Sequence, residues 1–224
     1  MPDHKGRFDA AECAVLASVM ALRRDVRGNR FTDEAVSDEQ IDRIIDAGLC
    51  APSVGFSQPW EFVVVRDADT REQVRASYLC ENEKAESLFS DDKALLYRQL
   101  KLEGLVEAAV NVAVFYRPCD EPVLGQTTMR EVGLYSVVCA VQNMWLMARA
   151  LNLGLGWVSI LDPERVKTIL GAAAQLQLVA YLCIGHVDRF EERPELERLG
   201  WEERKQREQV VHHECFGAGE RPGK

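Results

Sequence analysis

Three arginines and one aspartate lie within five residues near the start of the chain, at Arg23-Arg24-Asp25-Val26-Arg27. Guanidinium groups this close repel one another unless an anion lies between them. The planar fork of arginine suits phosphate, which it can bind through two parallel hydrogen bonds. The cluster therefore indicates a phosphate site. A solvated, basic helix end remains the alternative, because a helix dipole also favours cations at that position.

A second stretch with the composition of a binding site is residues 51–60, which read Ala-Pro-Ser-Val-Gly-Phe-Ser-Gln-Pro-Trp. Small, turn-forming residues alternate there with aromatic ones. Ser53 and Gly55 leave backbone N–H groups able to approach a ligand closely. We interpret the stretch as a shaped binding loop and not as a linker.

Other kinds of site have weaker support. Residues 212–215 (His-His-Glu-Cys) offer metal-ligand types in a row, but adjacent residues cannot all face one ion, so we expect no metal site. Ser159 lacks the Gly-x-Ser-x-Gly surroundings of a hydrolase nucleophile. The glycine patterns of Rossmann and Walker nucleotide sites are also missing.

Composition narrows the class of protein. The chain has 27 basic and 36 acidic side chains, a net charge of -9, which disfavours nucleic acid and anionic membranes as partners. No apolar run approaches the length that spans a bilayer, and the first ten residues are too polar for a signal peptide. The seven cysteines lack a Cys-x-x-Cys pair, and most have apolar neighbours. We therefore expect buried free thiols in a cytoplasmic protein.

Apolar spacing predicts the elements that must position these residues. β-Branched and aromatic runs predict strands at residues 60–65, 110–116, 155–160 and 176–184. Helical periodicity predicts helices at residues 11–22, 37–49, 69–88, 131–151 and from 163 onward, with a weak signal over 90–104. This order is typical of an α+β fold with a small sheet and a helical majority.

Capping signals mark where several helices begin. Ser37 and Gln40 form a predicted capping box, and Asp69 and Glu72 form a second predicted pair. Asp162 precedes a proline at the first helical position. The core face of the helix after Ser37 is expected to consist of Ile41, Ile44, Ile45 and Leu49.

Two segments outside the expected core are polar. Residues 82–98 suggest a lid over a pocket, with a solvated helical hairpin as an equal alternative. Residues 188–224 are too charged to form their own core, so this tail either wraps around a partner subunit or stays mobile. Residues 1–10 resemble a flexible arm, and we expect residues 11–224 to form one domain.

These motifs together resemble the nitroreductase-like flavoprotein superfamily and, within it, the 5,6-dimethylbenzimidazole synthase family, whose members destroy flavin. The similarity runs from about residue 19 to residue 217. Besides the motifs above it includes Leu-Lys-Leu-Glu-Gly at 100–104, Tyr-Ser-Val-Val-Cys-Ala-Val-Gln-Asn at 135–143, Gly-Trp-Val-Ser-Ile at 156–160 and Pro-Glu-Leu at 194–196. Leu88 stands where a lid methionine is expected, a nearly isosteric change.

The resemblance implies a nitroreductase-like fold: a small central mixed or antiparallel sheet surrounded by helices, a helical lid and an extended C-terminal tail. It also implies a homodimer that binds FMN at the subunit interface. In that family, oxygen fragments reduced FMN to 5,6-dimethylbenzimidazole, the lower ligand of cobalamin, and erythrose 4-phosphate. A separate NAD(P)H-dependent flavin reductase would supply the reduced FMN.

The same resemblance assigns the site residues. Asp25 matches the essential acidic residue of the family and suits general acid/base catalysis, and Ser159 matches a serine near the flavin. Neighbouring arginines favour the ionised form of Asp25 and burial favours the neutral form, and sequence leaves open which dominates. Ser159 could instead be a strand hydroxyl bonded to backbone. The expected catalytic residues are Asp25 and Ser159, and the expected cofactor-binding residues are Arg23, Arg24, Asp25, Val26, Arg27, Pro52, Ser53, Gly55, Leu102, Gly156 and Ser159.

Three other functions remain open on the same fold. One is an NAD(P)H-dependent nitro- or flavin reductase whose bound flavin survives turnover. Another is a reductive dehalogenase, because lidded deiodinases share the fold. The third is a flavin carrier without catalytic activity.

Overall fold

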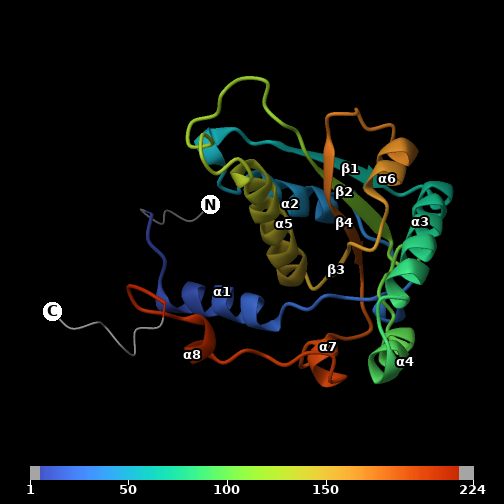
Figure 1. The fold of residues 1–224 in the computed structure, drawn as a ribbon. Helices are drawn as coiled ribbons and strands as arrows, with labels where there is room; N and C mark the ends of the chain where they lie inside the picture. Colours follow the sequence, from blue (N-terminus) through green and yellow to red (C-terminus); the bar gives the residue numbers. More distant parts are fainter. Residues whose placement is uncertain (1–5, 217–224) are drawn as a thin grey trace. The chain divides into compact units, whose positions relative to one another are not determined.

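The computed structural model describes residues 6–216, and the chain divides into two compact units at residues 192 and 193. The C-terminal unit contains two short helices, α7 (Glu195–Arg198) and α8 (Arg207–Val210). The N-terminal unit contains all the remaining helices and strands (Figure 1). Its helices are α1 (Ala10–Leu22), α2 (Asp38–Leu49), α3 (Ala68–Glu86), α4 (Asp91–Gln99), α5 (Val132–Ala150) and α6 (Pro163–Leu170), with 3-10 turns η1 (Gly28–Arg30) and η2 (Val54–Phe56). Its strands are β1 (Trp60–Val65), β2 (Val110–Tyr116), β3 (Gly154–Val158) and β4 (Gln177–Gly185).

The sheet of the N-terminal unit is antiparallel throughout, with strand order β1-β2-β4-β3. All four strands lie where the sequence predicted them, within two residues at each end. The predicted α+β class and the small antiparallel sheet are therefore confirmed. The order of elements places β3 at one edge of the sheet, where the arginine cluster also lies.

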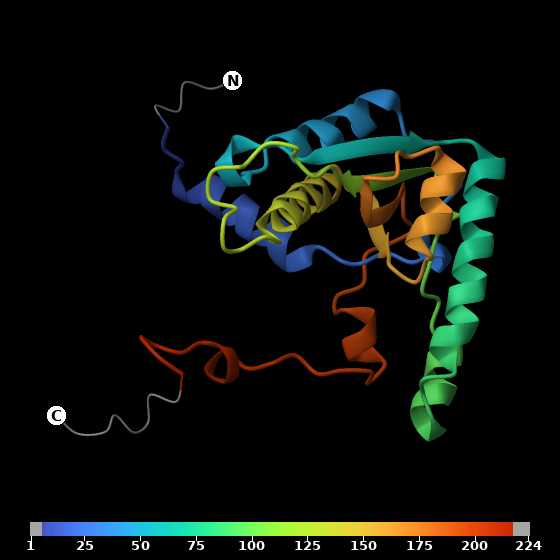
Figure 2. The ribbon, with the colours of Figure 1, turned by 45° about the horizontal axis from the view of Figure 1, so that its top comes forward.

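Alternation along the two central strands builds a core on each face of the sheet. Val112 and Leu182 pack with α2 and α5, whereas Ala113 and Tyr181 pack with α3 and α6. Successive strand residues point to opposite faces, so both faces of these strands can be apolar. Figure 2 shows α2 and α5 on one side of the sheet and α3 and α6 on the other.

Local capping explains where the helices begin. Ser37 and Gln40 donate backbone N–H groups to each other's side chains at 2.9 and 3.2 Å, which confirms the predicted capping box. Asp162 caps α6 as predicted. The predicted cap at Asp69 is wrong: α3 begins at Ala68, because Asp67 is extended and its carboxylate accepts from Thr70 N–H at 2.7 Å.

Two predictions of burial are also wrong. Leu49 was placed on the core face of α2 but is 48% exposed at the C-terminal end of that helix. Of the seven cysteines, all free, only Cys183 is buried. Apolar neighbours in sequence do not ensure that a side chain is buried in the fold. Cys139 lies on an exposed face of α5, and Cys13 lies on α1, which contains no buried residue.

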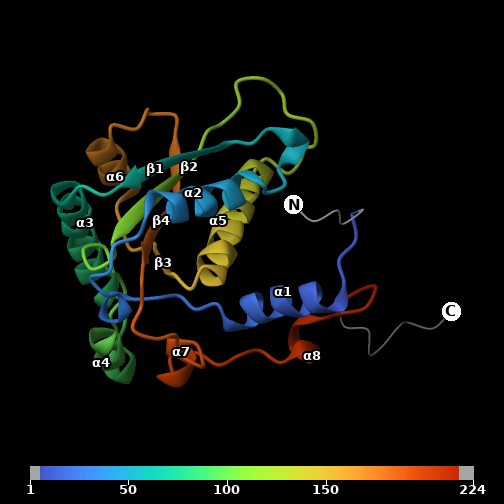
Figure 3. The same cartoon turned by 180° about the vertical axis from the view of Figure 1, so that it is seen from behind.

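Helix α1 has an apolar sequence and yet remains open. Val15, Leu16 and Met20 are each about half exposed or more. The helix lies beside the C-terminal half of α5, as the view from behind indicates (Figure 3). Within residues 6–216, no helix is long and apolar enough to cross a membrane.

Candidate functional site

The arginine cluster leaves α1 as an extended segment along the edge of the sheet. Helix α1 ends at Leu22, and the ψ of 137° at Arg23 turns the chain out of the helical conformation. Asp25 then pairs with Leu155 of β3 in a parallel bridge, and Val26 N–H donates to the Leu155 carbonyl at 3.1 Å. Three predicted site residues (Asp25, Val26 and Gly156) are thereby brought side by side.

The carboxylate of Asp25 is held from two directions. Its Oδ1 accepts the backbone N–H of Trp157 at 3.1 Å, and its Oδ2 forms an ion pair with Arg27 Nη2. The side chain is 34% exposed, so one side of the carboxylate faces outward. A carboxylate fixed in orientation and still accessible is suited to transferring a proton.

Arg27 is in turn fixed by the loop that follows α4. Its Nη1 donates to the Leu102 carbonyl at 3.0 Å, and the next residue, Gly28, donates its N–H to the Glu103 carbonyl at 2.8 Å. The predicted site residue Leu102 therefore contributes a backbone oxygen to the cluster.

Arg23 is the arginine of the cluster whose guanidinium N–H groups are not used by hydrogen bonds to described residues. Its guanidinium lies over the Trp145 ring, 4.5 Å from the centroid, a cation–π arrangement. Within residues 6–216, no oxygen accepts a hydrogen bond from it. Burial lowers the pKa of Arg23, and the charge of Asp25 offsets this only in part. Partly desolvated donors without an acceptor suit an anionic ligand.

Arg24 is arranged differently from Arg23. Its guanidinium donates to the carbonyls of Ala21, Arg23 and Glu191 at 2.9, 2.6 and 2.9 Å and to that of Glu192. Its donors are thus shared among backbone oxygens, and its contact with a cofactor remains a prediction.

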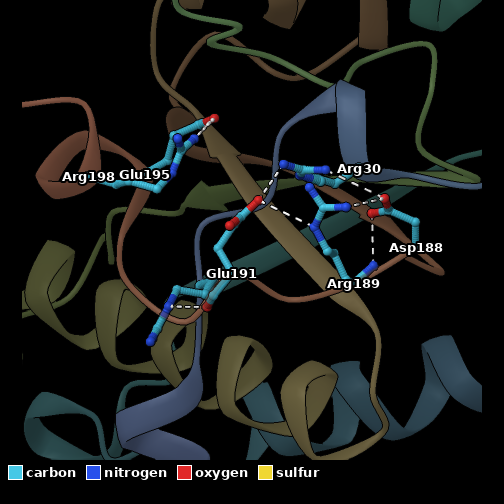
Figure 4. A network of polar contacts seen from close by, with 7 residues as sticks. Arg30, Asp188, Arg189, Glu191, Glu195 and Arg198 are labelled. Carbon is cyan, nitrogen blue, oxygen red and sulfur yellow. Dashed lines mark hydrogen bonds and ion pairs between the residues drawn. The ribbon is translucent and has the colours of Figure 1, made fainter.

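The segment that Arg24 contacts is also held by a network of ion pairs. Arg30 pairs with Glu191 and, at 3.5 Å, with Asp188, while Arg189 lies 3.7–3.8 Å from the same two carboxylates (Figure 4). The more exposed of these pairs contribute little energy each, but together with the partly buried Arg30–Glu191 pair they hold residues 188–191. Within the C-terminal unit, Glu195 and Arg198 form a separate pair at 3.6 Å.

Two residues of α5 that were not predicted as site residues hold the arginine segment. Trp145 Nε1 donates to the Arg24 carbonyl and Arg149 Nε to the Leu22 carbonyl, each at 3.1 Å. Burial, with a smaller effect of Arg24, lowers the pKa of Arg149. Their spacing of four residues puts both on one helix face, which is the signal that could have identified them.

Ser159 follows the end of β3 and is exposed. It lies two residues beyond Trp157, and therefore about 7 Å further along the chain from the N–H that binds Asp25. Its hydroxyl makes no hydrogen bond to any described residue, so the alternative of a backbone-bonded strand hydroxyl finds no support there.

The loop at residues 51–58 has a strained backbone. Gly55, Phe56 and Gln58 all have positive φ (55°, 55° and 47°). Such conformations cost energy in residues other than glycine and concentrate at ligand-binding sites. Ser53 Oγ accepts Gln58 N–H at 3.0 Å, and the buried Ser57 hydroxyl has no partner among the described residues.

One chain does not bring this loop to the arginine cluster. Val54 N–H donates to Ser136 Oγ in the first turns of α5, whereas Trp145 and Arg149 hold the cluster near its last turn. Ser136 and Trp145 are nine residues apart, or about 14 Å along the helix. Pro52, Ser53 and Gly55 are therefore separated from the other predicted site residues by about half the length of α5.

The segment predicted as a lid is a hairpin of α3 and α4. The amide oxygen of Asn82 accepts from the hydroxyls of Tyr78 and Tyr97 at 3.2 and 2.8 Å, and Phe89 stacks on Tyr97. Burial, followed by the charge of Glu103, raises the pKa of Tyr78 to about 12. These contacts hold α3 and α4 together, and the charge effect indicates that Tyr78 lies near Glu103.

Comparisons with known proteins identify the fold. The sequence pattern of the nitroreductase family matches residues 20–186. A 5,6-dimethylbenzimidazole synthase of Rhodospirillum rubrum is 43% identical over 203 residues, which cover 88% of this chain and 94% of that protein. A BluB-like flavoprotein structure from Clostridium difficile has a TM-score of 0.68 at 23% identity, with 88% of this chain and 98% of that chain covered.

A second structural neighbour is iodotyrosine deiodinase bound to FMN and 3-iodo-L-tyrosine. Its TM-score is 0.71 at 21% identity, with 90% of this chain and all of that chain covered. At such identities the two structures support the fold alone. The family match and the 43% identity go further: the chain belongs to the nitroreductase family and, within it, to the group of the 5,6-dimethylbenzimidazole synthases.

Proposed function

We propose that this chain fragments reduced FMN with oxygen, releasing 5,6-dimethylbenzimidazole and erythrose 4-phosphate. The 43% identical relative carries the name of that synthase, which is the external support. The structural observation that carries the proposal is Asp25, whose carboxylate is oriented by Trp157 N–H and Arg27 beside the free donors of Arg23.

The residues present fit FMN. A phosphate needs charged donors without competing acceptors, and Arg23 provides them. Gly156 and Val26 pack backbone against backbone beside the arginines, and the Leu102 carbonyl holds Arg27. Reduced flavin and oxygen supply the redox reactivity, so the protein has to bind, orient and transfer protons.

Asp25 and Ser159 have different roles in this proposal. Ring contraction and cleavage of the ribityl chain both require proton transfers, and Asp25 is placed to give and accept them. The Trp157 N–H and Arg27 keep its carboxylate in one orientation. Ser159, exposed and without a hydrogen bond to a described residue, is available to bind the ribityl chain or the reacting oxygen.

A homodimer would complete the site. The loop at residues 51–58 contacts α5 about 14 Å from the point where the arginine cluster contacts it, so within one chain the two elements do not adjoin each other. In a two-fold dimer, the loop of one subunit can face the cluster of the other. The open apolar face of α1, with Val15, Leu16 and Met20, is suited to such an interface.

The α3–α4 hairpin, residues 82–98, would act as the lid in this assembly. Excluding water from the flavin would keep the reaction from ending in unproductive oxidation. We further propose a separate NAD(P)H-dependent flavin reductase as the source of reduced FMN, and the cytoplasm as the location.

The decisive experiment supplies the protein with FMN, a flavin reductase and NADH under air and assays 5,6-dimethylbenzimidazole by chromatography. The proposal predicts the product in amounts that depend on protein, oxygen and reductase. Rapid NADPH oxidation with intact FMN would indicate an ordinary reductase instead. Loss of halide from a halotyrosine would indicate a dehalogenase, and tight FMN binding without product a carrier.

A further inference from the structure

A partly buried ion cluster lies beneath the turn that carries Arg27. We define it as Lys101, Glu103 and Glu107, with Lys101 Nζ 2.5 Å from Glu103 Oε1 and 2.7 Å from Glu107 Oε1. The Glu103 side chain is only 4% exposed, and its second oxygen accepts Leu105 N–H at 2.7 Å.

Stability alone explains such a cluster poorly. Burying a carboxylate is costly, and buried ion pairs are often no better than apolar residues of similar volume. Burial lowers the pKa of Lys101, but its hydrogen bonds to Glu103 and Glu107 outweigh that effect and raise it overall. For Glu107, burial raises the pKa, but the hydrogen bond and charge of Lys101 lower it by more, so the net shift is downward. Both groups therefore stay charged.

The residues of the ion cluster lie next to, or include, those whose backbone carbonyls hold the arginine segment. Leu102, whose carbonyl accepts from Arg27, lies between Lys101 and Glu103 in sequence. The Glu103 carbonyl accepts from Gly28 N–H. Residues 100–104 belong to neither helix nor strand, so regular backbone hydrogen bonding does not fix these carbonyls.

Close packing transmits the position of the cluster to the turn. A Cβ on Gly28 would stand 2.7 Å from Glu107 Cδ and 2.8 Å from Lys101 Cε. Gly28 therefore rests directly on both side chains. Rearrangement of these side chains would change the packing beneath the backbone next to Arg27.

We propose that Lys101 and Glu103 are positioning residues for Asp25, acting through the Leu102 carbonyl and the Arg27 guanidinium. This inference rests on the proposed function, because it takes Asp25 as the group that transfers protons. Lys101 and Glu103 fix the loop, the loop fixes Arg27, and Arg27 fixes one oxygen of the carboxylate.

The test compares Glu103→Gln and Lys101→Met in the full-length protein. Glutamine keeps the shape of Glu103 and removes its charge. The rate of dimethylbenzimidazole formation at saturating reduced FMN should fall about tenfold or more, because small misplacements of a reacting group are costly. Binding of oxidised FMN, followed by flavin fluorescence, should weaken less than about threefold, since Arg23 is unaffected.

A readout independent of turnover is hydrogen exchange of residues 26–31. Loss of the ion cluster should release the Gly28–Glu103 hydrogen bond and speed exchange in that peptide. Lys101→Arg should retain the charge and most of the rate. Lys101 is 35% exposed, so Lys101→Met decides the matter if Glu103→Gln does not fold.

The matched control is Lys167→Met on α6. Lys167 is also buried, 3.0 Å from Glu164 and 2.9 Å from the Ala174 carbonyl, with no contact to the arginine segment. It should lower the thermal midpoint and leave both the rate and the exchange of residues 26–31 unchanged. An equal loss of rate in this control would overturn the proposal.

So would folded variants of Lys101 and Glu103 that keep the parent rate within about twofold. Unchanged exchange at residues 26–31 in these variants would also overturn it. If the parent protein forms no dimethylbenzimidazole, the proposed function fails, and the exchange result still decides whether the cluster fixes the Arg27 turn.

Discussion

Gly156 lies against Val26 so closely that a Cβ at position 156 would stand 2.1 Å from the Val26 carbonyl oxygen. This approach lets Val26 N–H reach the Leu155 carbonyl and lets Trp157 N–H reach Asp25. The glycine in β3 is therefore a condition for the arginine segment to lie along the sheet edge, and so for the orientation of the Asp25 carboxylate.

Gly156→Ala should separate the arginine segment from β3. We expect oxidised FMN to bind about tenfold more weakly or worse, as measured by fluorescence titration, because the arginines and Asp25 lose their support. Gly171→Ala is the control: its φ of 65° costs about 1 kcal/mol for a non-glycine residue, but a Cβ there meets no atom within 4 Å. FMN affinity should stay normal in the control, and normal affinity in Gly156→Ala would contradict the assignment.

Arg23→Ala should abolish discrimination between FMN and riboflavin, which lacks the phosphate. Loss of a charged hydrogen-bond donor costs about 1.5–3 kcal/mol, so FMN should bind about tenfold to a hundredfold more weakly. Riboflavin binding should change little, which makes riboflavin an internal control for damage to the pocket. Equal weakening of both ligands would instead indicate that Arg23 supports the fold through Trp145.

Asp25→Asn should bind FMN and form almost no 5,6-dimethylbenzimidazole. Asparagine can still accept Trp157 N–H through its amide oxygen, so the segment should keep its place, while proton transfer is lost. General acid/base catalysis contributes about 10²–10⁴-fold, and a loss of that size is expected in product assays. The exposed Asp42→Asn variant on α2 should behave like the parent, and full activity of Asp25→Asn would refute its role.

Local signals were the part of the structure that sequence could predict. The Ser37–Gln40 capping box and the β-branched runs of β1 and β2 depend on residues close together in the chain, and all three were located correctly. Asp69 failed because Asp67 offered the same chemistry two residues earlier. Side-chain type alone could not distinguish the two.

The site roles that sequence could not predict depend on tertiary contacts. Arg23 and Arg24 are adjacent and chemically identical, yet one stacks on Trp145 and the other donates to backbone oxygens more than 160 residues away. The roles of Trp145 and Lys101 likewise depend on carbonyls supplied by distant segments. The separation of the loop at 51–58 from the cluster follows from which end of α5 each one contacts.

Mixing two impaired variants should raise activity if the site is shared between subunits. Arg23→Ala damages the cluster, and Gly55→Ala distorts the loop, because its φ is 55° and a Cβ would lie 2.7 Å from the Leu124 carbonyl. After denaturation and joint refolding, about half of the dimers should be mixed and have one intact site of two, giving about a quarter of parent activity. No recovery would place both elements in the same subunit's site.

The alkaline stability of the protein should depend on Tyr78. Its pKa is raised from 10 to about 12 by burial and by Glu103, so its neutral form is favoured in the folded state. This contribution is complete below pH 10 and is lost as the pH rises towards 12, when the unfolded chain releases its proton first. The parent should therefore lose about 1 kcal/mol of unfolding free energy between pH 9 and pH 11 from this residue.

Tyr78→Phe should remove that part of the loss, although it costs about 1 kcal/mol at neutral pH through the hydrogen bond to Asn82. Urea unfolding at the two pH values measures both effects, with the exposed Tyr135→Phe as the control. An equal alkaline loss in Tyr78→Phe and in the parent would show that Tyr78 does not couple to folding in this way.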